Sequence, residues 1–235
     1  MLIKVASYNI HKAVGTDLRR SPERILAVLT EIDADIVALQ EADQRFGARL
    51  TALPLAMIAA TTPYKAVSYD IRPGSLGWHG NAILVRDTAT VISCAHLVVP
   101  HFEPRGAVMA DVEVADHIVR VVGMHLDLSG LRRRHQAQAI IAQIAPRLPL
   151  PTVLMGDLNE WRSRGGCLSD FQNAYELVDT GPSFHAQRPV ASLDRIMIST
   201  DLKLVSAGVH NSPLARLASD HLPIWAHINM STNAF

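Results

Sequence analysis

The strongest constraint on the fold is a recurring pattern in which a short apolar run ends at a polar residue. Val5 to Ile10 is one such run and carries Asn9 at its end, and Ile36 to Leu39 is another, followed by Gln40 and Glu41. Short runs that are apolar on both faces are typical of strands buried between two layers. A chain built from such strands is restricted to a layered architecture, with its site where strand ends meet.

Both halves of the chain use the same unit of strand, helix and strand. In the first half a helix starts at Ser21-Pro22-Glu23, with serine as its cap and proline in the first turn. In the second half, Ile118 to Met124 delivers His125, a helix starts near Ser129, and Thr152 to Met155 delivers Asp157. Apolar residues at helical spacing stripe both helices, namely Ile25, Val28, Leu29 and Ile32 in the first and Ala137, Ile140, Ile141 and Ile144 in the second. The separation from Asn9 to Glu41 equals that from His125 to Asp157, as two similar units would produce.

The remaining patterns complete an α/β prediction. Further short strands are predicted at Ala82–Val85, Ala107–Val114, Leu193–Ile198 and Leu222–Ile228, and surface loops at Pro63–Gly80 and Trp161–Gly166. Each half is expected to supply its own sheet. We therefore predict one α/β domain over residues 1–235, a four-layer sandwich of two face-to-face mixed β-sheets flanked by helices.

Composition excludes several classes of protein. The chain has 22 Lys plus Arg and 22 Asp plus Glu, so it lacks the positive field of a protein that coats nucleic acid. Hydrophobic residues at 49% and charged residues at 19% exclude intrinsic disorder. Cys94 and Cys167 form neither a disulfide framework nor a common zinc pattern. With no secretory segment or membrane span in the pattern, we expect a cytoplasmic protein without stable membrane insertion or an obligate protein partner.

Polar residues that carry chemistry stand at or beside the ends of the apolar runs. They are Asn9, Glu41, His125, Asp157, Asn159, Asp194, Asp220 and His221. If they converge, two carboxylates about 4 Å apart repel each other by roughly 4 kcal/mol at an effective dielectric near 20, so a cation is needed. Carboxylate and amide oxygens without cysteine favour Mg²⁺, with Mn²⁺ as the alternative, over zinc. Such an ion suits phosphate chemistry.

Six segments in order resemble the signatures of the endonuclease/exonuclease/phosphatase superfamily. They are Ser7-Tyr8-Asn9-Ile10-His11-Lys12, Leu39-Gln40-Glu41, Met124-His125-Leu126, Gly156-Asp157-Leu158-Asn159, Leu193-Asp194-Arg195-Ile196 and Ser219-Asp220-His221. The resemblance spans nearly the whole chain and implies a DNase I-like fold. The length and the first segment look most like small bacterial members of the superfamily.

The resemblance also implies a role for each residue. Glu41 would ligate the metal, supported by Asn9, and Asp220 would complete the acidic set. Asp157 would orient or deprotonate the attacking water, and Asn159 would help to hold it. His221 would donate to the phosphate with its tautomer fixed by Asp194, and His125 would contact the phosphate from the other side. Three further residues are predicted to bind substrate, namely Arg105, Asn81 and His11.

The sequence therefore predicts a metal-dependent hydrolase that cleaves a phosphoester, a diester in preference to a monoester, by in-line attack of water. A nucleic-acid end and a phospholipid or other small phosphodiester are both open as substrates. Ile10-His11-Lys12-Ala13 follows Asn9 where DNA-repair members usually carry Asn-Gly, which disfavours abasic-site repair. Two alternatives are a calcineurin-like metallophosphatase, for which the motif order is wrong, and a binding scaffold of the same fold without turnover.

Single residues also have ordinary structural explanations. Asn9 alone is most often a turn or capping residue, and Asp220-His221 could cap an element beside a surface histidine. Arg132-Arg133-Arg134 opens the second helix as a solvated face, although cations there oppose the helix dipole and hint at an anionic ligand.

Overall fold

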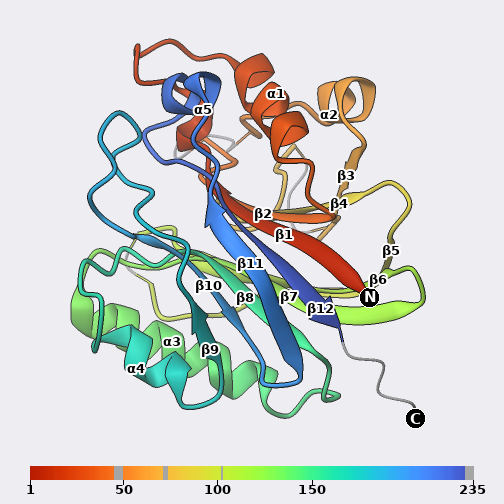
Figure 1. Cartoon of the computed structure of the whole chain (residues 1–235), viewed down its shortest axis with the longest axis vertical. Helices are drawn as coiled ribbons and strands as arrows, with labels where there is room; N and C mark the ends of the chain where they lie inside the picture. Colours follow the sequence, from red (N-terminus) through yellow and green to blue (C-terminus); the bar gives the residue numbers. More distant parts are fainter. Residues whose placement is uncertain (45–49, 71–73, 102, 231–235) are drawn as a thin grey trace.

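Two mixed β-sheets form the middle of the molecule (Figure 1). The computed structural model describes residues 1–44, 50–70, 74–101 and 103–230. Within them, the first sheet has the order β11 (Leu202–Val209), β12 (Ile224–Met230), β1 (Leu2–Asn9), β2 (Ile36–Gln40), β4 (Ala82–Arg86) and β3 (Tyr64–Ala66). The second has the order β5 (Thr90–Leu97), β6 (Gly106–Val114), β7 (His117–His125), β8 (Thr152–Asp157), β10 (Asp194–Ile198) and β9 (Glu176–Val178).

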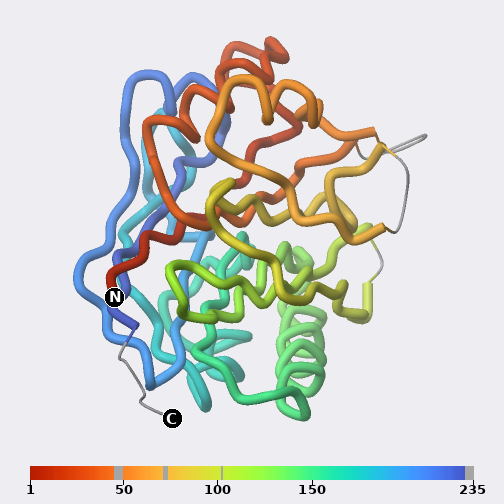
Figure 2. The backbone as a smooth tube through the Cα atoms, turned by 90° about the vertical axis from the view of Figure 1, so that its right-hand side faces the viewer, coloured from red at the N-terminus to blue at the C-terminus, as the bar shows by residue number. Residues whose placement is uncertain are grey.

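Helices cover the outer face of each sheet, which gives the four layers that the sequence predicts. On the first sheet lie α1 (Pro22–Ile32), α2 (Leu55–Thr61) and α5 (Pro213–Ala218), and on the second lie α3 (Gly130–Ile144) and α4 (Cys167–Gln172). The side view keeps this order, with the red and orange helical segments above the sheets and the green α3 below (Figure 2). None of the described helices is long and apolar enough to cross a membrane.

Three apolar clusters hold the layers together, and the middle one joins the two sheets. It contains Val5 and Ile36 from the first sheet and Val121 and Val153 from the second, all fully buried. Burying such side chains contributes roughly 1.5–3 kcal/mol each, an upper estimate because the unfolded chain already hides part of its surface. The outer clusters pack each sheet against its helices.

Both predicted strand-helix-strand units are confirmed. In each, the two strands are parallel neighbours, with Asn9 beside Gln40 in the first and His125 beside Asp157 in the second. The carboxyl ends of parallel strands lie at the same edge of a sheet, so each unit presents its polar residues together. The units also face each other, because β1 packs against β8 and β2 against β7.

The assignment of one sheet to each half of the chain is wrong. The C-terminal strands β11 and β12 join the first sheet, where β12 pairs antiparallel with β1. β1 is buried on both faces, so its free edge needs a hydrogen-bonded neighbour, and the apolar β12 supplies one. The predicted surface loop Pro63–Gly80 is also wrong in part, because it contains β3, whose Tyr64 packs in the core; residues 71–73 of that loop lie outside the described residues. The loop Trp161–Gly166 is confirmed.

Gly156 is required for the backbone that delivers Asp157. Its φ is +155°, and an added Cβ would lie 1.9 Å from the Met124 carbonyl oxygen of the neighbouring strand. We expect Gly156→Ala to lower the free energy of unfolding by at least about 3 kcal/mol, because backbone on both sides must move. Urea denaturation followed by circular dichroism measures the loss. Gly130→Ala at the start of α3, where the nearest atom is Arg133 Nη2 at an ordinary contact distance of 3.5 Å, should change stability little; equal losses in the two variants would contradict this account.

Candidate active site

The alternation of side chains along four strands brings the polar residues into one place. In β1, Ile3, Val5 and Asn9 share the face between the sheets, and in β8, Val153, Met155 and Asp157 do the same. His125 continues the inward-facing row of β7, and Asp194 that of β10. The apolar inter-sheet core therefore ends in a polar layer at one edge of the sandwich. Asn9 Nδ2 donates to Asp157 Oδ2 across the two sheets at 3.0 Å.

The Asp157 carboxylate lies at the centre of this layer and is buried. Its Oδ1 accepts the backbone N–H of Asn159 at 2.9 Å, and its Oδ2 accepts Asn9. Two imidazole nitrogens also approach Oδ2, with His125 Nε2 at 3.3 Å and His221 Nε2 at 3.8 Å. The separation between His221 Nε2 and Asp157 Oδ2 is longer than a hydrogen bond.

His221 and Asp194 form a buried, hydrogen-bonded pair. His221 Nδ1 donates to Asp194 Oδ2 at 2.8 Å, and the same oxygen accepts the Ser183 hydroxyl. Although burial disfavours the imidazolium, the Asp194 and Asp157 carboxylates raise the pKa of His221 to about 10. The Phe184 ring lies 4.8 Å from the imidazole and restricts it. At neutral pH, His221 thus presents an Nε2–H toward Asp157.

His125 has the opposite electrostatic environment. Burial and the guanidinium of Arg105 lower the pKa of His125 to about 4, although the carboxylates of Asp157 and Glu41 act to raise it. Arg105 Nη1 hydrogen-bonds His125 Nε2, so that nitrogen accepts and the neutral ring carries its proton on Nδ1. The two histidines therefore differ in charge at neutral pH, an arrangement typical of sites with distinct proton donors and acceptors.

Glu41 lies on the other wall of the site, directly after β2, with a left-handed φ of 53°. Burial alone would raise the pKa of Glu41. Two positive groups outweigh it and lower the pKa to about 2, namely His125 when it is protonated and Lys12, whose Nζ contacts Glu41 Oε2. His125 is charged only below about pH 4, so at neutral pH the Lys12 ammonium is the cation in contact with Glu41. Glu41 is therefore ionised throughout the physiological range.

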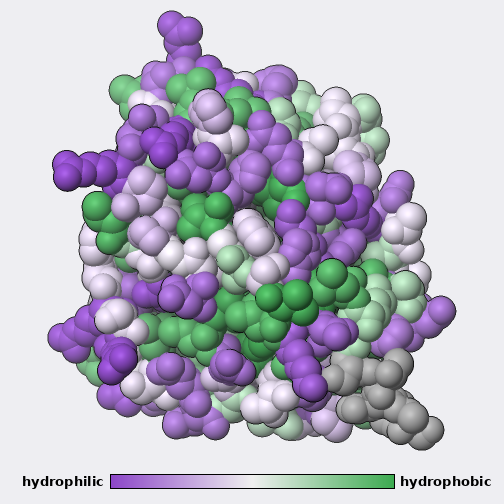
Figure 3. Space-filling view, in the orientation of Figure 1, coloured by the Kyte–Doolittle hydropathy of each residue, from purple (hydrophilic) through white to green (hydrophobic). Residues whose placement is uncertain are grey.

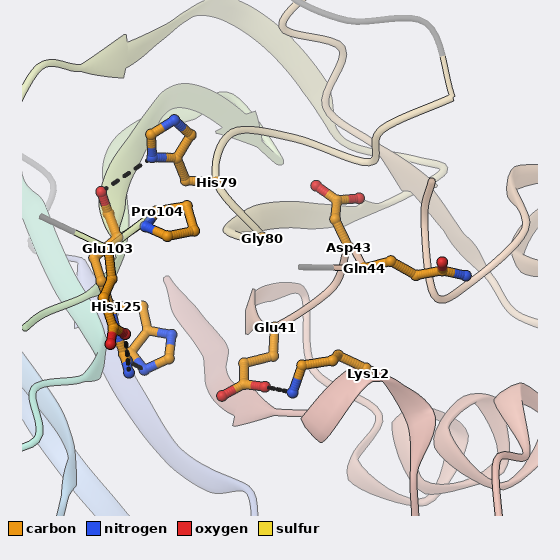
Figure 4. A pocket seen from close by; sticks show the side chains of 10 residues that line it. Lys12, Glu41, Asp43, Gln44, His79, Gly80, Glu103, Pro104 and His125 are labelled. Carbon is orange, nitrogen blue, oxygen red and sulfur yellow. Dashed lines mark hydrogen bonds and ion pairs between the residues drawn. The ribbon is translucent and has the colours of Figure 1, made fainter. Parts of the chain in front are cut away.

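A cavity opens between these two walls. Figure 4 shows Glu41 and Lys12 on one side and His125 with Pro104 on the other, with Asp43 and Gly80 at the far end. Arg105 also lines the cavity and lies 3.6 Å from Glu103. The lining of the cavity combines carboxylate, guanidinium and imidazole groups.

The carboxylates and the histidine that lie close enough together to hold a metal ion are not the predicted ligands Glu41, Asn9 and Asp220. In the described part of the chain, the one group of three whose ligand atoms lie within 4.8 Å of one another is Asp157, Asp194 and His221. His221 commits Nδ1 to Asp194 and carries a proton on Nε2, so it repels a cation in that state. Glu41, Asn9 and Asp220 offer hard oxygen donors without a thiol, and Glu41 already attracts a cation, the Lys12 ammonium. By donor chemistry, a Mg²⁺-type ion fits the Glu41 side better.

The other predicted residues lie at various depths. Asn159, with a φ of 50°, turns toward β7 and donates through Nδ2 to the Leu126 carbonyl at 3.0 Å. Asp220 and His11 lie half-buried, with Asp220 Oδ1 3.7 Å from His11 Nδ1. Asn81 does not line the cavity; it is fully buried and donates to the Trp78 carbonyl at 3.3 Å. Asn81 therefore supports the His79-Gly80 turn, and its contact with substrate stays a prediction.

Three residues of the site were not predicted. Lys12 belongs to the segment Ser7 to Lys12 that resembles a family signature. Its positive charge three residues after Asn9 was the sequence feature that could have indicated a place in the site. Ser183 and Phe184 lie in a loop without apolar periodicity, and nothing in the sequence indicates their contacts with Asp194 and His221. At two of the arginines that open α3, protein carboxylates take the place of the anionic ligand considered above, since Arg133 pairs with Glu160 and Arg134 with Asp170.

The fold and the polar layer together define a two-sheet phosphoesterase fold, and the sequence profile of the endonuclease/exonuclease/phosphatase family matches residues 6–221. The chain belongs to this family, which rules out the calcineurin-like alternative. No curated protein matches the sequence.

Several solved structures share the fold. A conserved protein of unknown function from Enterococcus faecalis V583 aligns with a TM-score of 0.78 at 18% identity, covering 97% of this chain and 100% of the other. A mannosyl-6-phosphatase from Bacteroides thetaiotaomicron gives 0.75 at 19% identity, covering 97% and 99%. D. rerio TDP2 complexed with single-strand DNA product gives 0.71 at 15% identity, covering 97% and 99%. At these identities the likeness establishes the fold alone.

The charge on His221 gives a prediction that needs no substrate. Asp194→Asn removes the carboxylate that stabilises the imidazolium, so the pKa of His221 should fall by more than about one unit from its value near 10. NMR titration of the imidazole nitrogens measures it. Ser183→Ala keeps the carboxylate and should leave the imidazole charged at pH 8.

The same shift makes stability depend on pH. Because the pKa of His221 is raised from 6.5 on folding, its stabilising effect is complete below about pH 6.5 and is lost as the pH rises toward 10. Asp194→Asn should flatten the alkaline part of the stability curve. An unchanged titration of His221 in this variant would show that Asp194 does not hold the proton.

Proposed function

We propose that this protein is a divalent-metal-dependent phosphoesterase that hydrolyses a phosphodiester by in-line attack of water. The observation that carries the proposal is the environment of Asp157 Oδ2, which Asn9 at the end of β1, His125 at the end of β7 and His221 in the segment before β12 approach within 3.8 Å. Such convergence of one carboxylate and two differently charged imidazoles is suited to moving a proton. Family membership supports the reaction class.

The residues divide the work as follows. Asp157 accepts the proton of a water held against it, with its orientation fixed by Asn9 and the Asn159 N–H. His221, charged and braced by Asp194, donates from Nε2 to a phosphate oxygen as negative charge builds on it. Arg105 binds the phosphate from the cavity wall together with neutral His125. No covalent enzyme intermediate is required.

Mg²⁺, or Mn²⁺ in its place, is the cofactor that we propose. Glu41 and Asn9 would hold the ion with Asp220 near the rim, and the bound ion supplies charge that stabilises the phosphate oxygens and the leaving group. Hard oxygen donors and the absence of a thiol among these residues support this choice over zinc.

The substrate range is tested with a panel. We expect hydrolysis of bis(p-nitrophenyl) phosphate with Mg²⁺ or Mn²⁺, slower hydrolysis of p-nitrophenyl phosphate, and loss of both with EDTA. Nicked DNA and sphingomyelin distinguish a nucleic-acid substrate from a lipid head group. Turnover that survives EDTA would contradict the metal mechanism, and the absence of turnover on the whole panel would favour a scaffold that binds without catalysis.

A further inference from the structure

Three loops that carry or adjoin the site also expose large apolar side chains. Leu128 follows β7, Leu131 lies in the adjoining first turn of α3, Trp161 follows β8, and Val190 precedes β10. Their exposed fractions are 63%, 68%, 66% and 72%. We call these four residues and their loops the loop rim. Leaving four large apolar groups in water beside one site is unusual unless something covers them.

The loop rim is held as one surface. The buried guanidinium of Arg133 joins two of the loops, since Nη1 donates to the Leu128 carbonyl at 2.7 Å and Nη2 lies 3.2 Å from Glu160 Oε2. The second and third loops meet where the Trp161 and Phe184 rings lie 6.0 Å apart, and Val190 N donates to the Phe184 carbonyl at 2.8 Å. The apolar groups therefore keep fixed relative positions.

The charge of the loop rim is positive although the whole chain is neutral. The three loops and the first turn of α3 expose Arg132, Arg162, Arg164 and Arg188. Their acidic residues are Asp127 and Glu160, which are buried, and Asp179, which is exposed. Leucine, valine and tryptophan among arginines are the composition of a surface that enters the interface of an anionic bilayer.

We propose that the loop rim docks on the surface of an anionic phospholipid bilayer, with Leu128, Leu131, Trp161 and Val190 in the interface and the arginines at the head groups. A single-stranded nucleic acid fits less well, because three of the four apolar groups are aliphatic and cannot stack on bases. Docking needs no hydrolysis and so goes beyond the proposed function. That the substrate phosphoester then belongs to a lipid head group rests on the proposed function.

Co-sedimentation with vesicles tests the docking. We expect the full chain to bind vesicles of phosphatidylcholine mixed with phosphatidylglycerol, more weakly as salt rises, and to bind phosphatidylcholine alone poorly. Leu128→Ser combined with Leu131→Ser should weaken binding about tenfold or more, and so should Arg162→Gln combined with Arg164→Gln. Lipids brominated on the acyl chain should quench Trp161 in a Trp78→Phe, Trp225→Phe background.

Exposed apolar residues elsewhere provide matched controls. Leu148, which is 71% exposed, lies beyond the far end of α3, and Val205, which is 59% exposed, lies on β11. β11 lies on a face that a band of hydrophobic surface crosses (Figure 3). Leu148→Ser and Val205→Ser should leave vesicle binding unchanged.

The outcomes separate docking from catalysis. Equal losses in control and rim variants, no binding to anionic vesicles, or binding to a single-stranded oligonucleotide without binding to vesicles would each overturn the docking proposal. Circular dichroism checks that the variants fold, and the quenching of Trp161 in the otherwise unsubstituted rim tests the contact independently of them. Vesicle binding without hydrolysis of any phosphoester would contradict the proposed function and leave the docking intact.

Discussion

Asp157→Asn is expected to lower kcat/KM for phosphodiester hydrolysis by about 10²- to 10⁴-fold, the range that a positioned general base contributes. The reason lies in the hydrogen bonds of the carboxylate. Oδ1 accepts from the Asn159 N–H and Oδ2 from Asn9 Nδ2, so both oxygens face donors. An amide of the same shape places an N–H against one of these donors and can no longer take a proton from water. Initial rates on bis(p-nitrophenyl) phosphate measure the effect.

The same substitution should leave the fold intact at a modest cost. One lost hydrogen bond and one donor facing another lower the free energy of unfolding by about 1–3 kcal/mol, which urea denaturation can separate from the loss of rate. Asp201→Asn removes an exposed carboxylate on the turn before β11 and should retain full activity. If Asp157→Asn keeps more than about a tenth of the wild-type rate, Asp157 does not activate the water.

The inner part of the site is predictable because strand alternation and strand ends both leave a trace in the sequence. Asn9 lies four residues after Val5 in β1, and Asp157 lies four residues after Val153 in β8. Because side chains alternate along a strand, both share the face of the apolar core. Parallel pairing then brings His125 beside Asp157. The contact between Asn9 and Asp157 follows once the two sheets pack face to face.

What the sequence could not show depends on contacts between distant segments. The sheet to which β11 and β12 belong is decided by which edge of β1 is free, and no local pattern carries that information. β5 was not predicted because its exposed residues, among them Ser93 and His96, break the apolar alternation. No local pattern shows that the side chain of Asn81 is fully buried and donates to the Trp78 carbonyl.

Glu41→Gln is expected to weaken Mn²⁺ binding about 100-fold and to reduce phosphodiester turnover by about 10³-fold. Glu41 is ionised at all physiological pH values because its pKa lies near 2, so the substitution removes a full negative charge from the side of the site with hard oxygen donors. Electron paramagnetic resonance of free Mn²⁺ measures binding without substrate. Glu176→Gln, which changes the exposed first residue of β9, provides the control.

A substitution of Lys12 should have the opposite effect on Mn²⁺ affinity. Its ammonium contacts the Glu41 carboxylate, so an incoming divalent ion must displace it or share the charge. Lys12→Met should therefore tighten Mn²⁺ binding by up to about fivefold, the effect of a partly exposed ion pair. The double variant should bind Mn²⁺ like Glu41→Gln alone, because without the Glu41 carboxylate Lys12 no longer competes with the ion. If Glu41→Gln binds Mn²⁺ as the wild type does, the ion belongs with Asp157 and Asp194, and His221 must give up its proton to admit it.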